Sequence, residues 1–140
     1  MRRLVFNEDD RVTKWVFERL PYSNDHTPCT ALGLESNGQL IAGVVFNSYN
    51  GFDINITLAA EHGRIWARPQ WICAVFSYVF LQLQCRRCTV HVAFENEASR
   101  RVIEGLGFKY EGLLRDALPG DDVVIYGMLK SECRYLPRTH

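Results

Sequence analysis

The sequence predicts an α/β fold of the α+β kind, in which a mostly antiparallel, mixed sheet of about seven strands is flanked by three helices. Three observations support this expectation. Residues 52–60 alternate apolar and polar side chains with the period of a half-buried strand. The pair Asn37-Gly38 separates two strand-like runs, and both residue types tolerate the positive φ of a tight hairpin. Apolar residues recur with helical spacing in residues 69–84 and 96–106.

The N-terminal third is expected to contain a first strand, a helix and a hairpin. Asn7 or Asp9 is a candidate cap for the helix, and Pro21 ends it. A run of turn-forming residues, YSNDHTP, then predicts a loop at 22–28. The strands of this part are predicted at residues 2–6, 30–35 and 39–47.

The middle of the chain is expected to add a third hairpin strand, a buried helix and another strand. Asn50-Gly51 is a second turn signal, which places the next strand at 52–60. Pro69 suits the first turn of the helix that follows, because the amide that proline lacks would be unpaired there. This helix is apolar nearly all round and too short to cross a membrane, so we expect it to pack on the sheet. The next predicted strand covers residues 88–94.

The last third contains the segment ENEASRRVIEGLGFKYEGLLR, which predicts a short helix followed by a strand. Asn96 is a good N-cap, because its side-chain oxygen can accept a hydrogen bond from a first-turn amide. Gly107 suits the left-handed position just after the helix. Strands are predicted at 108–114 and 123–129. An apolar final strand at a sheet edge can pair with a second copy, so a homodimer is one expectation.

Composition is that of one globular domain, residues 1–140, with a formal net charge of zero. Zero net charge gives no general attraction to nucleic acid or to a membrane surface. The five cysteines are an odd number, and no signal peptide is expected, which favours a reducing cytoplasm. Cys85 and Cys88 form a lone CxxC without the second ligand pair of a zinc site. We interpret them as ordinary thiols and expect no metal.

The C-terminal motifs resemble the GNAT superfamily of N-acetyltransferases, and in particular the branch that includes ribosomal-protein-alanine acetyltransferases. The pattern is Asn-x-x-Ser, an apolar helix face, Leu-Gly-Phe and then Glu-Gly-x-x-Arg. The tail YGMLKSECRYL also looks like GNAT-like proteins found in bacteriophage genomes. The matching residues are Asn96, Ser99, Leu106, Gly107, Phe108, Glu111, Gly112, Arg115, Tyr126, Gly127 and Met128.

The resemblance implies a GNAT-like fold that binds acetyl-CoA as co-substrate where the fourth and fifth strands separate. By resemblance, the main chain of Leu58, Ala59 and Ala60 would hydrogen-bond the pantetheine arm as an added strand does. Asn96 would order the same arm, and Ser99 would be the hydroxyl that protonates the leaving thiolate. A structural interpretation remains open for both, because Asn96 suits an N-cap and Ser99 a first turn.

The loop before Pro69 departs from the family motif, in which two small residues let the main chain close on the pyrophosphate. Arg64 and Trp66 occupy those positions here, and only Gly63 is available nearby. Arg64 and Arg68 can hold phosphate through their guanidinium groups instead. Two functions therefore stay open: an acetyl-CoA-dependent N-acetyltransferase, and a non-catalytic GNAT-fold binding or assembly protein.

The general base and the amine acceptor are not fixed by any motif. Glu61, at the end of the fourth strand, is our candidate base, with His62 and Asp53 as weaker alternatives. His91 lies in the middle of a strand and is interpreted as structural. In the family, the segment that corresponds to residues 22–28 borders the acceptor, which is expected to be a primary amine of a small molecule, peptide or modified base.

Overall fold

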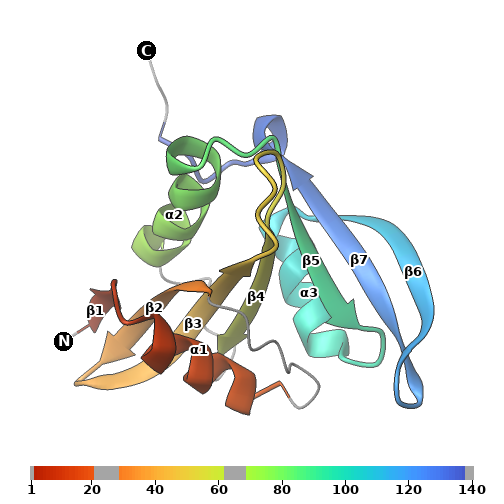
Figure 1. Ribbon diagram of the computed structural model, residues 1–140, viewed down its shortest axis with the longest axis horizontal. Helices are drawn as coiled ribbons and strands as arrows, with labels where there is room; N and C mark the ends of the chain where they lie inside the picture. The colour runs from red at the N-terminus through yellow and green to blue at the C-terminus, as the bar shows by residue number, and fades with distance from the viewer. Residues whose placement is uncertain (1, 21–28, 62–68, 138–140) are drawn as a thin grey trace.

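A computed structural model describes residues 2–20, 29–61 and 69–137 of the chain (Figure 1). The strands are β1 (Arg2–Val5), β2 (Thr30–Ser36), β3 (Gln39–Asn47), β4 (Asn55–Ala60), β5 (Arg87–Ala93), β6 (Lys109–Leu118) and β7 (Asp121–Leu129). The helices are α1 (Asp9–Glu18), α2 (Pro69–Ser77), its π-helical continuation Tyr78–Gln82, α3 (Glu97–Leu106) and a 3-10 turn at Lys130–Glu132.

The described strands form a seven-stranded sheet in the order β1-β2-β3-β4-β5-β7-β6. Every neighbouring pair is antiparallel except β4 and β5, which run parallel. This confirms the predicted mixed, mostly antiparallel sheet with three helices. The final strand, β7, lies between β5 and β6, so the predicted edge position of that strand is wrong and β6 forms this edge of the sheet.

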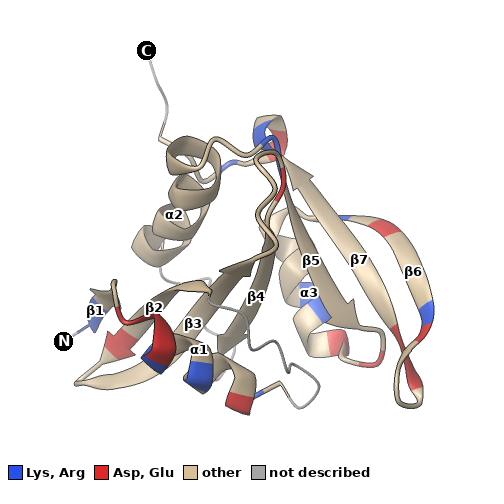
Figure 2. Cartoon of the chain, in the orientation of Figure 1, with Lys and Arg blue, Asp and Glu red and all other residues tan. Residues whose placement is uncertain are grey.

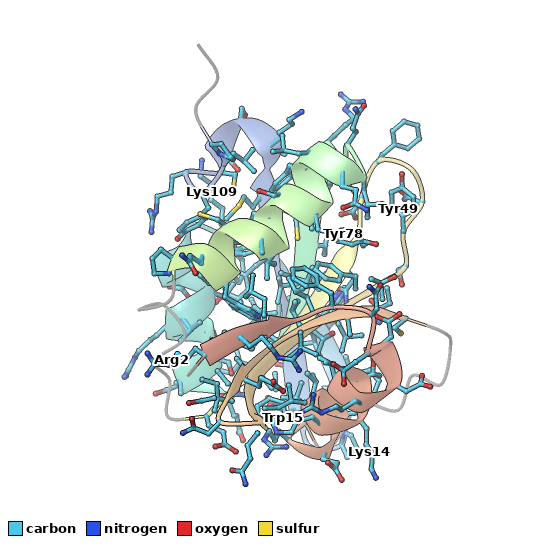
Figure 3. All side chains as sticks on the ribbon, turned by 90° about the vertical axis from the view of Figure 1, so that its left-hand side faces the viewer. Arg2, Lys14, Trp15, Tyr49, Tyr78 and Lys109 are labelled. Atoms are coloured by element: carbon cyan, nitrogen blue, oxygen red, sulfur yellow. The ribbon has the colours of Figure 1, made fainter. Side chains whose placement is uncertain are left out.

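Helices cover the two faces of the sheet unequally. The main core packs α2 and α3 on one face, with Phe76 and Ile103 buried against Val44 and Val92. A smaller core packs α1 on the other face, over the N-terminal strands. Figure 3, turned by 90° from Figure 1, shows β1 between α2 and α1. On the face that carries α1, this helix covers β2, β3 and part of β4, and no other helix among the described residues packs there.

Two predicted element starts are corrected by local hydrogen bonds. The strand predicted from Phe52 begins at Asn55. Asn50 Oδ1 accepts hydrogen bonds from the amides of Phe52 and Asp53, a side-chain turn that turns the Phe52 side chain outward, where it is 62% exposed. Asp9 does not cap α1; its carboxylate instead accepts a hydrogen bond from the amide of Ala31 at 2.9 Å and joins the helix to β2.

The ends of α3 form as predicted. Asn96 is the N-cap, and its side chain accepts from the amide of Ser99 at 3.2 Å. Gly107 has φ 110° in the left-handed position after the helix. The sequence from Asn96 to Gly107 therefore fixes where α3 starts relative to β5 and where it ends relative to β6.

Cys85 and Cys88 are free, buried thiols where α2 leads into β5, and burial raises the pKa of both. No group of side chains within the described ranges is arranged to hold a metal ion. No helix in those ranges is long and apolar enough to cross a membrane. Figure 2 shows basic or acidic residues on α1, β2, α3 and β6, whereas α2, β3 and β4 carry none.

Candidate active site

Strands β4 and β5 begin as neighbours and then separate. Their parallel register includes only Asn55 with Thr89 and Ile56 with Val90. Beyond these pairs β4 continues to Ala60 and β5 to Ala93 without further pairing between the two strands (Figure 1). The separation leaves part of the inner edge of each strand without a backbone partner across the gap.

The unpaired edge of β4 carries the main-chain groups of Leu58 and Ala60. Glu61 donates its amide hydrogen to the carbonyl of Ile41 on β3. Hydrogen bonding alternates along an antiparallel pair, so Ala59 also bonds toward β3, whereas Leu58 and Ala60 point their main-chain groups toward β5. The amide of Thr89 on β5 bonds to the carbonyl of Ile54, which agrees with this alternation. Of the three residues predicted to bind pantetheine through the main chain, two have their backbone groups turned to the gap.

A cleft of about 890 Å³ occupies the gap and connects both faces of the sheet. Side chains that alternate along a strand point to opposite faces. Leu58 and Ala60 pack against the core under α2 and α3, whereas Ala59 packs toward α1. The cleft is lined from the first face by residues such as Leu58, Val92 and Ile103, and from the second by residues such as Thr57 and His91.

Helix α3 presents its first turn to the cleft. Asn96, Ala98 and Ser99 all line it. The Oδ1 of Asn96 is used as the helix cap, which leaves its Nδ2 as the group able to donate to a ligand. The Ser99 hydroxyl has no hydrogen-bond partner among the described residues. Both predicted residues therefore perform their structural role and still reach the cleft.

Trp71, on the first turn of α2, is a wall residue that sequence reasoning assigned only to the core. Its side chain is 1% exposed, and its indole Nε1 has no hydrogen-bond partner within the described residues. A buried donor without a partner costs about 1–3 kcal/mol. The nitrogen has almost no accessible surface, so it lies behind the wall of the cleft rather than open to it.

His91 belongs to a hydrogen-bonded chain on the face that carries α1. Its Nδ1 donates to Asn55 Oδ1 at 2.7 Å, and Asn55 Nδ2 donates to Asn47 Oδ1 at 2.9 Å. The His91 side chain is exposed at the cleft but partly desolvated by its neighbours, which lowers its pKa, and the nearby charge of Asp53 opposes that shift. The sequence did show that His91 points away from Val90 and Val92. Its partner, however, lies 36 residues away on β4, and no local pattern indicates it.

The other predicted site residues lie outside the cleft or outside the described ranges. The carboxylate of Glu61 forms an ion pair with Arg19 at 3.0 Å, and Arg19, not Glu61, lines the cleft. Asp53 accepts hydrogen bonds from Thr89 Oγ1 at 2.8 and 2.9 Å. The residues outside the described ranges are His62, Gly63, Arg64, Trp66, Arg68 and the loop at 22–28.

The chain matches the acetyltransferase (GNAT) domain family over residues 3–109. It belongs to this family. The match covers the predicted cofactor-binding strand β4, the cleft and helix α3, so the GNAT assignment includes nearly all of the site described above. No curated protein matches the chain significantly.

Solved structures of other GNAT acetyltransferases have the same fold. A dodecameric spermidine N-acetyltransferase from Vibrio cholerae is 19% identical, with 94% of each chain covered and a TM-score of 0.71. A GNAT-family acetyltransferase from Bacillus anthracis is 22% identical, covering 73% of this chain and 67% of that chain, with a TM-score of 0.61. A further probable acetyltransferase is 21% identical, covers 94% and 93%, and has a TM-score of 0.65. At these identities the likeness shows the fold.

Proposed function

We propose that the chain is an acetyl-CoA-dependent N-acetyltransferase that acts on a primary amine of a small molecule, peptide or modified base. The observation that carries this proposal is the cleft where β4 and β5 separate, because it combines a strand edge without a partner across the gap with donor groups at the start of α3. Membership of the GNAT family supports the same reaction class. The residues 1–140 would then act as one acetyltransferase domain.

The described residues of the cleft fit a CoA thioester. The main-chain groups of Leu58 and Ala60 would bind an extended amide-containing arm as an additional strand does. The Nδ2 of Asn96 is a donor for its oxygen atoms. The thioester supplies the activated acetyl group, and the Ser99 hydroxyl would give a proton to the leaving sulfur.

The pyrophosphate end of the ligand is assigned by prediction only. Gly63, Arg64 and Arg68 precede α2 in the sequence, where the amides of a helix N-terminus and guanidinium groups favour an anion. Glu61 remains a predicted base. Its carboxylate pairs with Arg19 and does not line the cleft, so its role as the base rests on the sequence prediction alone.

Calorimetric titration with acetyl-CoA and with CoA tests the proposal. We expect both to bind, and we expect acetylation of at least one amine in a panel containing spermidine, an N-terminal alanine peptide and a lysine peptide. Ser99→Ala should keep the affinity and lower turnover by about 10–100-fold, because only the proton donor is lost. Ser131→Ala, at an exposed serine that does not line the cleft, is the matched control.

The two outcomes that contradict the proposal have different meanings. No heat with millimolar acetyl-CoA or CoA would show that the cleft does not bind the co-substrate. Binding without acetylation of any amine would favour the alternative, a non-catalytic GNAT-fold binding or assembly protein.

A further inference from the structure

The proton that must leave the acceptor amine needs a base inside the cleft, and the predicted base Glu61 pairs with Arg19 and does not line the cleft. An amine is mostly an ammonium ion at neutral pH, and it must lose a proton before its nitrogen can attack a carbonyl carbon. A general base should therefore line the cleft, be unprotonated at neutral pH and have a lone pair without a partner. Among the described wall residues, the imidazole of His91 has all three properties.

The hydrogen bonds of His91 determine which ring nitrogen carries the proton. Asn55 turns its amide nitrogen to Asn47 Oδ1, so Asn55 presents its oxygen to His91. An amide oxygen only accepts hydrogen bonds, and Nδ1 of His91 must therefore carry the hydrogen. In the neutral imidazole the lone pair then lies on Nε2, which forms no hydrogen bond with a described residue.

We propose that Nε2 of His91 is the general base of the acetyl transfer, and that Asn55 is a positioning residue that fixes its tautomer. This inference rests on the proposed N-acetyltransferase function. It assigns the base to the face of the sheet opposite Ser99, because His91 alternates with Val90 and Val92, which are buried in the core under α2 and α3.

The separation of base and acid across the sheet suits the reaction. His91 takes one proton from the acceptor ammonium, whose nitrogen uses the freed electron pair to bond to the acetyl carbonyl carbon. The carbon–sulfur bond breaks, and its electron pair leaves with the sulfur. Ser99 donates a proton to that sulfur and regains one from the acylated nitrogen. The products are the amide, the CoA thiol and one proton, which His91 releases to water.

Partial burial, and not a neighbouring charge, favours the neutral form of His91. Burial lowers its pKa from 6.5, and Asp53 opposes the shift. The Asp53 carboxylate accepts a hydrogen bond from the Thr89 hydroxyl and forms an ion pair with Arg87. The guanidinium of Arg87 also pairs with Glu111. The burial effect is the larger of the two. The acid limb of the pH–rate profile, where turnover falls as the base is protonated, should therefore lie below pH 6.5.

The flanking residues of β4 and β7 carry no charge, whereas three charged residues line the cleft: Arg19, Glu95 and Asp121. Across β5 its register partner on β7 is Ile125, and the flanking residues of β4 on this face are Asn55 and Thr57. On the α1 side the charged residue that lines the cleft is Arg19, which is paired with Glu61. Asp121, the first residue of β7, accepts hydrogen bonds with its carboxylate from the amides of Glu95 and Asp122.

The first test measures the tautomer directly in the wild-type chain. Long-range ¹H–¹⁵N NMR correlation of the imidazole of His91 at pH 7.5, a value about one unit above its ordinary pKa, should show a neutral ring with the proton on Nδ1. Asn55→Leu, which removes the acceptor, should produce a mixture of the two tautomers. A protonated Nε2 in the wild-type ring, or a charged ring at this pH, would overturn the assignment.

The second test measures turnover with the amine that the wild-type chain acetylates best. His91→Asn keeps a side-chain N–H near the position of Nδ1 but has no basic nitrogen. Turnover should fall by about 100-fold or more, the acid limb should disappear, and added imidazole should restore part of the rate. Acetyl-CoA affinity by calorimetry should stay within about threefold, since His91 contributes no predicted contact to the co-substrate.

The possible results separate the base assignment from the function on which it rests. Unchanged affinity with turnover within about threefold of wild type would overturn the role of His91 and leave the acetyltransferase intact. Wild-type chain that binds no acetyl-CoA, or that binds it and acetylates no amine, would overturn the proposed function and the base together.

Discussion

The two edges of β4 differ in how much backbone hydrogen bonding they make. On one edge, β3 pairs with β4 over its whole length, from Asn55 to Ala60. On the other edge, β5 pairs with it only at Asn55 and Ile56. The same six residues therefore belong to a closed sheet on one side and to an open cleft on the other.

The paired edge holds β4 in the sheet, while the other edge leaves a site open. On the paired side, α1 lies close to β3, because Gly43 has no side chain to separate the strand from Val12 and Val16. On the open side, the main-chain groups of Leu58 and Ala60 have no strand partner among the described residues. Unpaired backbone groups are costly when buried, and the cleft admits a ligand or water to satisfy them.

Proline substitutions at two adjacent residues of β4 distinguish the two edges. Ala59→Pro removes an amide that bonds to β3 and leaves the carbonyl of Gly43 unpaired, so the free energy of unfolding should fall by roughly 3 kcal/mol. Ala60→Pro removes an amide that points to the gap. It should change the unfolding free energy by less than about 1 kcal/mol and weaken acetyl-CoA binding about tenfold.

Urea unfolding and calorimetry of both variants check this pair of expectations. Equal losses of stability would show that the main chain of Ala60 also bonds within the sheet. Unchanged acetyl-CoA affinity in Ala60→Pro would show that the open edge of β4 does not bind the co-substrate.

A glycine substitution tests the close packing on the paired side. A Cβ on Gly43 would lie 2.7 Å from Val16 Cγ2 and 3.0 Å from Val12 Cγ1, so Gly43→Ala should lower the unfolding free energy by about 1–3 kcal/mol. Gly105→Ala is the matched control in α3, where no atom lies within 4 Å of the added carbon. It should raise stability by up to about 1 kcal/mol. Stabilisation by Gly43→Ala, measured by urea unfolding, would show that α1 moves aside easily.

The sequence predicted the fold well because its strongest signals are local. Asn37 and Gly38 both have positive φ, at 54° and 82°, as the hairpin between β2 and β3 requires. Asn96 and Gly107 define the ends of α3 for equally local reasons. The start of β4 was misplaced because apolar alternation continues through Phe52, whereas the Asn50 side-chain turn delays the strand.

The candidate site was predictable only where a motif or a strand end indicated it. Ser99 and the residues of β4 fall in the cleft for that reason. The pairing of His91 with Asn55 depends on the register of two parallel strands far apart in sequence, which no local pattern specifies. The same holds for Trp71, whose apolar neighbours on α2 predict a core residue and give no sign of an unpaired indole N–H.

The two sides of β4 should also respond to pH in different ranges. On the paired side, Glu35 of β2 accepts hydrogen bonds from Arg3 at 2.6 Å and Arg11 at 3.0 Å, and these bonds lower its pKa below 4.5. A lowered carboxyl pKa stabilises the folded state above 4.5, and the stabilisation is lost as the pH falls through the lowered value. Glu35→Gln should therefore melt a few degrees below wild type at neutral pH, and the difference should disappear as the pH falls through the lowered pKa of Glu35.

On the open side, protonation of His91 should stop turnover as the pH falls. This should happen at a higher pH than the protonation of Glu35, which breaks its ion pairs with Arg3 and Arg11. As the pH falls below 6.5, activity should decline while the melting temperature changes little, because Glu35 remains ionised until the pH is below 4.5. Thermal melts and initial rates measured over the same pH series check this order. A melting temperature that falls together with the rate would show that the acid limb reports unfolding rather than titration of the base.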